Sequence, residues 1–508
     1  MHNIHLKTAS VLLALYAIAA EAQSTYLPIA PSALVSSEQR LPTQSPQEAP
    51  PAVGQSYALT PNPSAAVLPK PHVDLDAEHP YTLPELIDLA EREHPETRIA
   101  WETARNAALT AGIARSTYLP RMSANVIGGH QASSGSSSAF GVNTQGSESV
   151  TGSVSSVTLA WLLFDFGARR NAVDAAQKVS LASNILFTGV HQKIIHDVCV
   201  AYYLYLAASR HTVTAAKALQ NAQEIQKAAE ERYRGGIGTV LESTQTRQVT
   251  AQAQLARIQA EGAERNAYVS LLGAMGFSAL EKIKIAPLER HTFTDDTRPA
   301  VEQVVTDALS RRADVLAAYA AEQASQAAVK AAETAYRPKI FLAGTGAYVS
   351  GQLGLTAIPA IGEQQLPTLN ITGNHWNSTV LLGLSVPIFD GHARANAISE
   401  AKNNSAKAAA TLDQTRIVAI REIVGAQNAL ETSLAADEAA RTLQDASQIS
   451  YDAALDAYKH DVGTITAAVA AQTQLLQATL ASDDAYSSTL SAAATLAFVS
   501  GTLVTAPR

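Results

Sequence analysis

The chain has 508 residues, of which 16% are charged, and a formal net charge of −8. It contains no long basic run, which argues against nucleic acid as a partner. The single cysteine, Cys199, cannot form an internal disulfide and has no metal-ligand spacing around it, so we expect it to be a packed core residue.

Residues 1–22 have the pattern of a secretory signal. Lys7 precedes an apolar run over residues 9–20, and Ala20-Glu21-Ala22 forms an A-x-A cleavage site. The apolar run is too short to span a bilayer as a helix. Residues 23–80 are rich in proline, serine and alanine, a composition that predicts an extended or disordered arm. The sequence therefore predicts an exported protein.

Residues 81–275 are predicted to form the first of two similar units. Its elements are a helix, a β-hairpin, a long helix and a return helix, at 82–118, 121–166, 168–234 and 239–275. Within the hairpin, the Gly/Ser-rich segment 134–152 predicts a loop, and clear alternation over 154–164 predicts a strand. Glycines after residue 234 predict a sharp turn between the long helix and the return helix.

A second unit is predicted over 301–500, after a linker over 276–300 and before a short tail over 501–508. Its elements are a helix, a β-hairpin, a long helix and a return helix, the last three at 339–390, 393–460 and 464–499.

The two units repeat a decapeptide where the last strand meets the long helix. Its copies are FDFGARRNAV at 164–173 and FDGHARANAI at 389–398, which are 225 residues apart (389 − 164). The turns at the far ends of the long helices repeat at the same offset, since Tyr233 corresponds to Tyr458 (458 − 233). A repeat at one spacing predicts a single body built from two similar halves.

Element lengths predict how each half is arranged. Each long helix is expected to extend about 100 Å, and the two shorter helices of the same half together match this length. Each half can therefore be a hairpin with one continuous side and one side made of two helices end to end. The predicted fold class is mostly α with membrane β, in an internally duplicated chain.

The alternating strands have about ten residues, a length that suits tilted transmembrane strands. Four aromatic residues are candidates for the membrane interface, namely Trp161, Phe164, Trp376 and Phe389. Four strands cannot close a barrel, so a membrane location requires an oligomer. Two chains would give a barrel filled by side chains, and three would give twelve strands around an open space.

Two other interpretations remain open from the pattern. The strands could form a soluble hairpin with one buried face. The whole chain could also be a secreted structural protein, an Ala-rich helical coiled coil with a small β-cap. The alternating strands, the tryptophans and the Gly/Ser-rich segments favour a membrane channel over this structural protein.

From about Tyr81 to Gly501 the chain resembles the TolC-like outer-membrane efflux family. The resemblance is carried by the duplicated junctions, by the paired turns that follow Tyr233 and Tyr458, and by Arg312-Ala313-Asp314 in place of that family's Arg-Pro-Asp. It implies a homotrimer with a twelve-stranded barrel in the outer membrane and a long α-helical barrel in the periplasm. Such a trimer is the exit duct of a tripartite efflux pump or a type I secretion system, and it binds a periplasmic adaptor coupled to an inner-membrane pump.

The resemblance also assigns roles to the two turns, which would be the periplasmic tips where adaptors bind. The candidate docking residues are Arg232, Tyr233, Arg234, Gly235, Gly236, Gly238, Tyr458, Lys459, His460 and Gly463. Charged residues at exposed turns can steer a partner. Well-known members carry acidic rings just past the second tip, but the corresponding residues here are about Ala467 and Ala470. Glu242 and Asp461 are therefore the candidates for a pore entrance.

Catalytic and cofactor motifs are not found in the sequence. His191 and His196 are five residues apart, so they do not share a helical face as a metal-binding pair would. No phosphate-binding loop is recognisable, and energy for transport would have to come from a partner. We expect no enzymatic activity, no cofactor and no metal.

Overall fold

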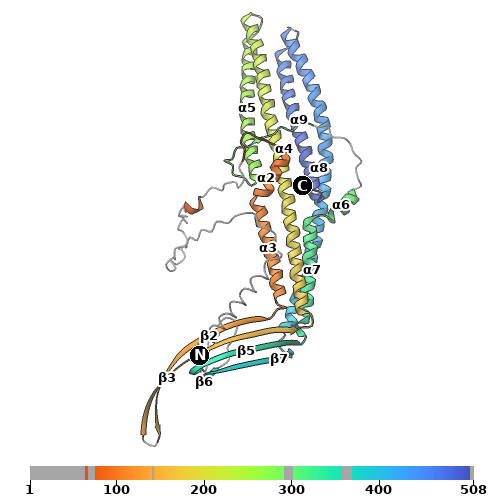
Figure 1. Ribbon diagram of the computed structural model, residues 1–508. Helices are drawn as coiled ribbons and strands as arrows, with labels where there is room; N and C mark the ends of the chain where they lie inside the picture. The colour runs from red at the N-terminus through yellow and green to blue at the C-terminus, as the bar shows by residue number, and fades with distance from the viewer. Residues whose placement is uncertain are drawn as a thin grey trace. The chain divides into compact units, whose positions relative to one another are not determined.

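The computed structural model describes residues 63–66, 75–139, 142–290, 301–355, 369–460 and 462–503. The chain divides into two units, Met1–Leu68 and Pro69–Arg508. The described structure of the first unit is a 3-10 turn, η1 (Pro63–Ala65). The second unit contains the other described helices and strands (Figure 1). The predicted signal, and most of the predicted arm, lie outside the described residues.

The second unit has a similar order of elements in its two halves. The first half contains β1 (Pro80–Tyr81), α2 (Leu83–Glu93), α3 (Pro95–Ser116), β2 (Arg121–Ala139), β3 (Val142–Phe164), α4 (Ala168–Arg234) and α5 (Val240–Ala274). After β4 (Lys284–Ile285), the second half contains α6 (Val301–Leu309), α7 (Ala313–Glu333), the 3-10 turn η2 (Thr334–Tyr336), β5 (Lys339–Leu355), β6 (Leu369–Thr372), β7 (His375–Ser385), α8 (Ala393–Lys459) and α9 (Ile465–Val499). The predicted fold class, mostly helical with few strands, is confirmed. In the described part of the chain, no helix combines the length and apolarity needed to cross a membrane.

The helix expected over 82–118 is in fact two helices, α2 and α3, so that prediction is wrong. Proline has no backbone N–H and disfavours helical geometry in the residue before it, and His94 precedes Pro95 with φ −65° and ψ 125°. The His94 ring then caps α3, because Nδ1 accepts a hydrogen bond from the backbone N–H of Glu96 at 3.1 Å. In the second half, Arg312 is extended in the same way before α7.

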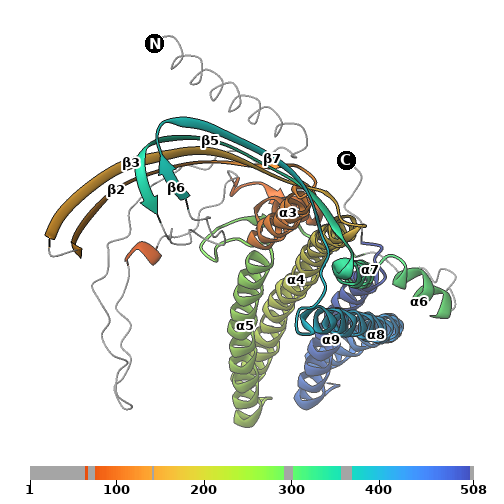
Figure 2. The ribbon, with the colours of Figure 1, turned by 90° about the horizontal axis from the view of Figure 1, so that it is seen from below.

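The long strands form an antiparallel sheet with β3 and β5 at its centre. β2 pairs with β3, β3 with β5, and β6 and β7 pair with successive parts of β5. Figure 2 shows β2, β3, β5 and β7 side by side in a curved sheet. The loop expected over 134–152 is wrong, because the pairing of β2 with β3 continues from Arg121↔Ala160 to Ala139↔Val142. Pairing satisfies the backbone polar groups, and serine and glycine add no bulk that would oppose it.

The helices pair lengthwise within each half. α4 packs against α3 and α5, and α8 packs against α7 and α9. Each half is therefore one long helix beside shorter helices placed end to end (Figure 1). The helices of the two halves meet mainly through α4, which also contacts α7 and α9, and the sheet joins the halves where β3 pairs with β5.

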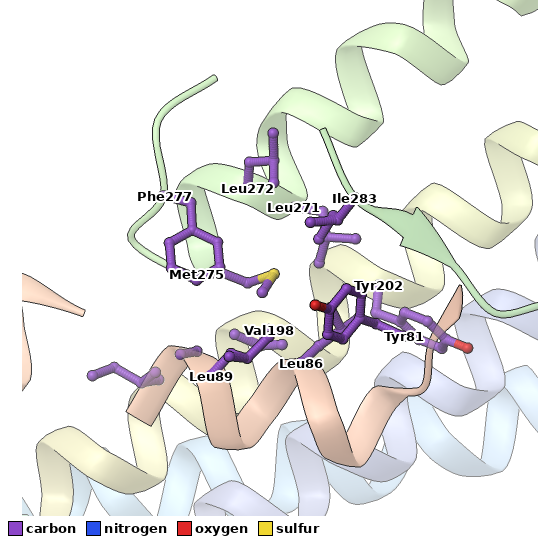
Figure 3. Packing of buried hydrophobic residues seen from close by; sticks show 12 residues of the cluster. Tyr81, Leu86, Leu89, Val198, Tyr202, Leu271, Leu272, Met275, Phe277 and Ile283 are labelled. Atoms are coloured by element: carbon purple, nitrogen blue, oxygen red, sulfur yellow. The ribbon is translucent and has the colours of Figure 1, made fainter. Parts of the chain in front are cut away.

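A buried hydrophobic cluster packs the middle of α4 against α2, α5 and the linker (Figure 3). Leu86 of α2, Val198 and Tyr202 of α4, and Met275 after α5 all belong to it. The Tyr202 hydroxyl also donates a hydrogen bond to the backbone carbonyl of Ala286 at 3.2 Å. The cluster therefore holds three helices of the first half, α2, α4 and α5, together with the linker between the halves.

Candidate functional site

The strand-to-helix junction of the first half is built around Asp165 and Arg169. The Asp165 carboxylate accepts hydrogen bonds from the Arg169 backbone N–H at 2.9 Å and from Nε at 3.0 Å, so it caps α4 and forms an ion pair. The guanidinium also donates to the carbonyls of Thr117, Leu162 and Leu163, at 3.1, 2.5 and 3.1 Å. These bonds fasten the end of α3, the end of β3 and the start of α4 to one another.

The second junction has the same plan with fewer bonds. Asp390 accepts a hydrogen bond from the Arg394 backbone N–H at 3.0 Å, and its carboxylate lies 3.3 Å from Arg394 Nη1. Two successive residues in each copy have positive φ, with 53° and 98° at Phe166 and Gly167 and 66° and 72° at Gly391 and His392. Glycine adopts this conformation without strain. In each copy one of the two residues with positive φ is a glycine, which is the second residue in the first copy and the first residue in the second copy. This exchange of position explains why the motif varies between the copies.

The four aromatic residues proposed for the membrane interface lie at the ends of the strands or just beyond them. Trp161, Phe164, Trp376 and Phe389 are all exposed in the single chain. The Trp161 indole N–H donates to the backbone carbonyl of Tyr118 at 2.9 Å, which fixes the ring near the start of β2. Contact of these rings with lipid stays a prediction.

The turn between α4 and α5, which is the tip of the first helical hairpin, needs glycine to reverse the chain direction. Gly236 has φ +77°, a conformation that favours glycine. The backbone N–H groups of Ile237 and Gly238 both donate to the carbonyl of Arg232, at 3.1 and 3.0 Å. A Cβ on Gly238 would lie 2.8 Å from the backbone nitrogen of Tyr233. The chain can therefore fold back over the end of α4 only with glycine at that position.

The turn between α8 and α9, which is the tip of the second helical hairpin, reverses the chain in the same way. The N–H groups of Val462 and Gly463 both donate to the carbonyl of Ala457, at 3.0 and 2.9 Å. A Cβ on Gly463 would lie 2.9 Å from the Ala457 Cβ. Asp461, one of the two candidates for the pore entrance, lies outside the described residues.

The candidate docking residues differ in exposure. The exposed ones are Tyr233, Arg234, Gly235, Gly236, Lys459 and His460. Arg232, Gly238 and Gly463 are half-buried, and Tyr458 is buried. The apolar Ile237 and Val462 are exposed in the same two turns, although the sequence analysis did not select them. An apolar residue at the apex of a predicted turn is the signal that would have found them.

Tyr458 joins the tips of the two hairpins. Its ring packs in a buried cluster with Ile225 of α4 and Ile465 of α9. The Arg232 guanidinium lies 5.2 Å from the centroid of the same ring. Burial, assisted by the charge of Glu242, raises the pKa of the Tyr458 hydroxyl. Tyr458 is thus a contact between the hairpins and not an exposed docking residue of this chain.

Glu242 has an observed local role at the start of α5. Its carboxylate accepts a hydrogen bond from the Thr239 backbone N–H, and the Thr239 hydroxyl accepts one from the Glu242 N–H, both at 3.2 Å. This reciprocal pair is a capping box. In the second hairpin Thr464 receives the equivalent bond from the Ala467 N–H at 3.2 Å, without a carboxylate. The expected pore-facing role of Glu242 stays a prediction.

The sequence did not reveal a buried ion cluster between the linker and the helices α8 and α9. The buried Asp437 of α8 lies 2.8 Å from Arg290 and 2.8 Å from Arg441. Arg290 also donates to the backbone carbonyl of Ser482 at 3.1 Å, and its guanidinium lies 4.8 Å from the ring centroid of Tyr486. Arg290 thereby fixes the linker to α8 and α9. Its partners are far away in the sequence, so no local pattern could reveal them.

The Arg312-Ala313-Asp314 motif forms a second ion cluster. Arg312 Nη2 lies 2.6 Å from Asp314 and 2.7 Å from Glu422, and Nη1 donates to the Val499 carbonyl at 3.3 Å. Burial by itself would raise the pKa of Asp314, but the bonds from Arg312 lower it below its usual value. The motif connects the start of α7 with α8 and the end of α9.

The single cysteine and two histidines of α4 have structural roles. Cys199 is buried, and burial raises the pKa of its thiol to about 11. His191 Nδ1 lies 3.4 Å from Glu91, and His196 Nε2 lies 3.1 Å from the Thr495 hydroxyl. Among the described residues, no group of three or more His, Cys, Asp or Glu side chains is placed to hold a metal ion.

Two long helical hairpins, each joined to strands of one sheet by the same capped junction, define a duplicated channel-type fold. The chain belongs to the outer membrane efflux protein family, whose model matches residues 86–277 and 304–502. It is therefore a protein of the cell outer membrane, with most of the chain in the periplasm. This result confirms the resemblance seen in the sequence.

Individual relatives agree with this family. The chain is 28% identical to Protein CyaE of Bordetella pertussis over 358 residues, which is 70% of each chain. It is 27% identical to the pyoverdine export outer membrane protein OpmQ of Pseudomonas putida over 276 residues, which is 53% of this chain and 58% of that protein. The crystal structure of the Campylobacter jejuni CmeC outer membrane channel has the same fold, with a TM-score of 0.68 at 19% identity over 82% of this chain and 85% of that one.

Proposed function

We propose that three copies of this chain form the exit duct of a tripartite efflux pump or a type I secretion system. The duct carries its substrate across the periplasm and the outer membrane. The observation that supports this most is that each half joins antiparallel strands of one sheet to a long helical hairpin that ends in an exposed turn. Because β6 and β7 pair with successive parts of β5, we count them as one strand position, which gives four positions per chain. Four are too few to close a barrel, whereas three chains would supply twelve. Family membership argues against the alternative, a secreted structural helical protein.

The exposed tips are the proposed docking site for a periplasmic adaptor, which in turn is coupled to an inner-membrane pump. Arg234 and Lys459 supply positive charge at the two turns, and such charge speeds the encounter with an acidic partner. Ile237 and Val462 supply exposed apolar side chains that a partner can bury. Each tip therefore presents one positively charged and one apolar side chain.

The pore entrance is proposed to include Glu242, and Asp461 stays the second candidate for it. In a trimer, three Glu242 carboxylates would attract cations and repel anions at the periplasmic mouth. At the other end, Trp161, Phe164, Trp376 and Phe389 are proposed to contact outer-membrane lipid, because tryptophan and other aromatic rings favour the interface.

Photocrosslinking in intact cells tests the docking proposal. A photoreactive amino acid at Arg234 or at Lys459 should trap the same periplasmic adaptor, whose loss should also abolish export. The same group at Trp376, an exposed residue of β7, is the control and should not trap it. Trapping from Trp376, or no trapping from either tip in cells that export, would refute the proposed docking site.

A further inference from the structure

We propose that the junction between the sheet and the helices binds the headgroups of anionic phospholipids in the periplasm-facing leaflet of the outer membrane. The binding surface, which we call the basic collar, consists of Arg121, Arg170, Arg337 and Lys339. The inference rests on the proposed placement of the strands in the membrane. It adds a lipid class and the residues that bind it, which this placement alone does not specify.

The four collar residues lie at one end of the sheet and are all exposed. Arg121 begins β2 and Lys339 begins β5, and the pairing of β5 with β3 and β7 brings the ends of those strands to the same level. Arg337 is two residues before Lys339, and Arg170 is in the first turn of α4, just after β3. Figure 1 shows the strands meeting the helices at this end. Because most of the chain lies in the periplasm, this end of the sheet faces the periplasm.

The junction has an excess of positive charge, although the whole chain has a formal net charge of −8. Its segments, which connect strands and helices, are residues 117–124, 160–172, 334–342 and 385–397. They contain five arginines, one lysine and two aspartates. Both aspartates are paired, Asp165 with Arg169 at 3.0 Å and Asp390 with Arg394 at 3.3 Å. The four collar residues therefore have no further carboxylate within these segments.

The strand segments that extend away from the collar are uncharged. Residues 122–129, 154–164, 340–350 and 376–385 contain no Asp, Glu, Lys, Arg or His. Uncharged strands of about this length suit the apolar layer of a membrane. The residues at which charge resumes mark the edge of that layer, and long cationic side chains there can extend toward the lipid phosphates.

Both halves build the collar from the same motif. Tyr118-Leu119-Pro120-Arg121 and Tyr336-Arg337-Pro338-Lys339 are 218 residues apart (339 − 121). The two tyrosines are 41% and 48% exposed, so an aromatic ring lies close in sequence to the cations in each half. The Tyr118 carbonyl accepts the Trp161 N–H at 2.9 Å, and the Arg169 guanidinium lies 5.2 Å from the Tyr118 ring centroid. These contacts hold the first motif in a fixed place at the junction.

The chemistry of the collar favours a phosphate group that carries net negative charge. A guanidinium can donate two parallel hydrogen bonds to one phosphate, and an ammonium attracts it as a point charge. A zwitterionic headgroup also carries a cation, which opposes binding to a cationic surface. Clusters of Lys and Arg next to a membrane-spanning segment therefore select anionic lipids. A lipid fits better than free phosphate, because its acyl chains can contact the uncharged strands.

Native mass spectrometry of the detergent-solubilised protein with added lipid tests the inference. The collar variant is Arg121→Gln/Arg170→Gln/Arg337→Gln/Lys339→Gln. The control variant removes four exposed cations of the helices and is Arg98→Gln/Lys217→Gln/Lys227→Gln/Arg265→Gln. The collar variant should bind phosphatidylglycerol about fivefold more weakly for each cation that contacts a headgroup, whereas the control variant should match wild type. Phosphatidylcholine should bind all three proteins alike.

Three results would overturn the inference. The first is equal phosphatidylglycerol affinity in the collar variant and wild type, and the second is an equal loss of affinity in the control variant. The third needs no variant: binding to wild type should weaken in high salt, which screens exposed charges, and salt-independent binding would refute the collar. Sodium phosphate should displace no more lipid than sodium chloride at the same ionic strength, and greater displacement would identify a free-phosphate site instead.

Bilayer recordings of wild type separate this inference from the proposed function. Wild type that inserts and conducts, combined with equal phosphatidylglycerol affinity in the collar variant, would overturn the collar and leave the duct. Folded wild type that enters no bilayer would overturn the duct and, with it, the membrane placement on which the collar rests.

Discussion

Replacement of Arg169 by alanine should be far more harmful than replacement of its counterpart, Arg394. Arg169 and Asp165 have side chains that are only 12% and 7% exposed. Removing one partner of a buried, hydrogen-bonded pair costs about 3–5 kcal/mol, because the other charge stays buried without compensation. The pair of Arg394 with Asp390 is more exposed, at 31% and 22%, and its cost should approach that of a surface pair, up to about 1 kcal/mol. The duplication therefore supplies a matched control at the equivalent position.

Thermal unfolding of the detergent-solubilised protein, followed by circular dichroism at 222 nm, would measure the difference. We expect Arg169→Ala to lower the unfolding midpoint clearly and Arg394→Ala to change it little. Arg169→Lys should recover only part of the loss, since one ammonium group cannot bond to Asp165 and to three carbonyls in the planar geometry of a guanidinium. Equal shifts for the two alanine variants would refute the reasoning, because burial and the three carbonyl bonds distinguish the two sites.

Three further predictions concern the tips and the ion clusters. Gly238→Ala should lower the unfolding midpoint because its Cβ would meet backbone atoms at 2.8 Å, whereas Gly273→Ala, with no atom nearby, should not. Glu242→Ala should cost about 0.3–1.5 kcal/mol because the capping box of α5 loses its carboxylate, while Glu242→Gln keeps the box. Both variants should reduce cation preference in reversal-potential measurements if this charge lies at the pore, and unchanged preference would remove Glu242 from the entrance. Because the folded-state pKa of Asp314 is lowered, its stabilisation is present above the unfolded value and is lost as pH falls below about 4; an Arg312→Ala variant with the same pH dependence would contradict this.

The sequence predicted the junctions well because their signals are local. An aspartate at a helix start, a nearby arginine and a glycine at the break are close together in the chain, and the structure places them as a cap and an ion pair. The bonds from Arg169 to Thr117, Leu162 and Leu163 could not be predicted. They depend on where α3 and β3 end in space, and no pattern around Arg169 contains that information.

Burial at the tips shows a second limit. Tyr233 and Tyr458 have equivalent positions in the repeat, yet only Tyr458 is buried. The difference comes from what packs on each hairpin and not from the residues themselves. The Gly/Ser-rich segment 134–152 was mispredicted for a related reason: composition favoured a loop, but pairing with the neighbouring strand decided the structure.

The central claim is that this chain forms a duct, and single-channel conductance of the purified protein in a planar bilayer tests it most directly. We predict discrete conductance steps, and larger steps from a variant with a loosened tip, Tyr458→Ala, because Tyr458 joins the two hairpin tips. Correctly folded, inserted protein that stays silent both as wild type and as Tyr458→Ala would contradict the duct.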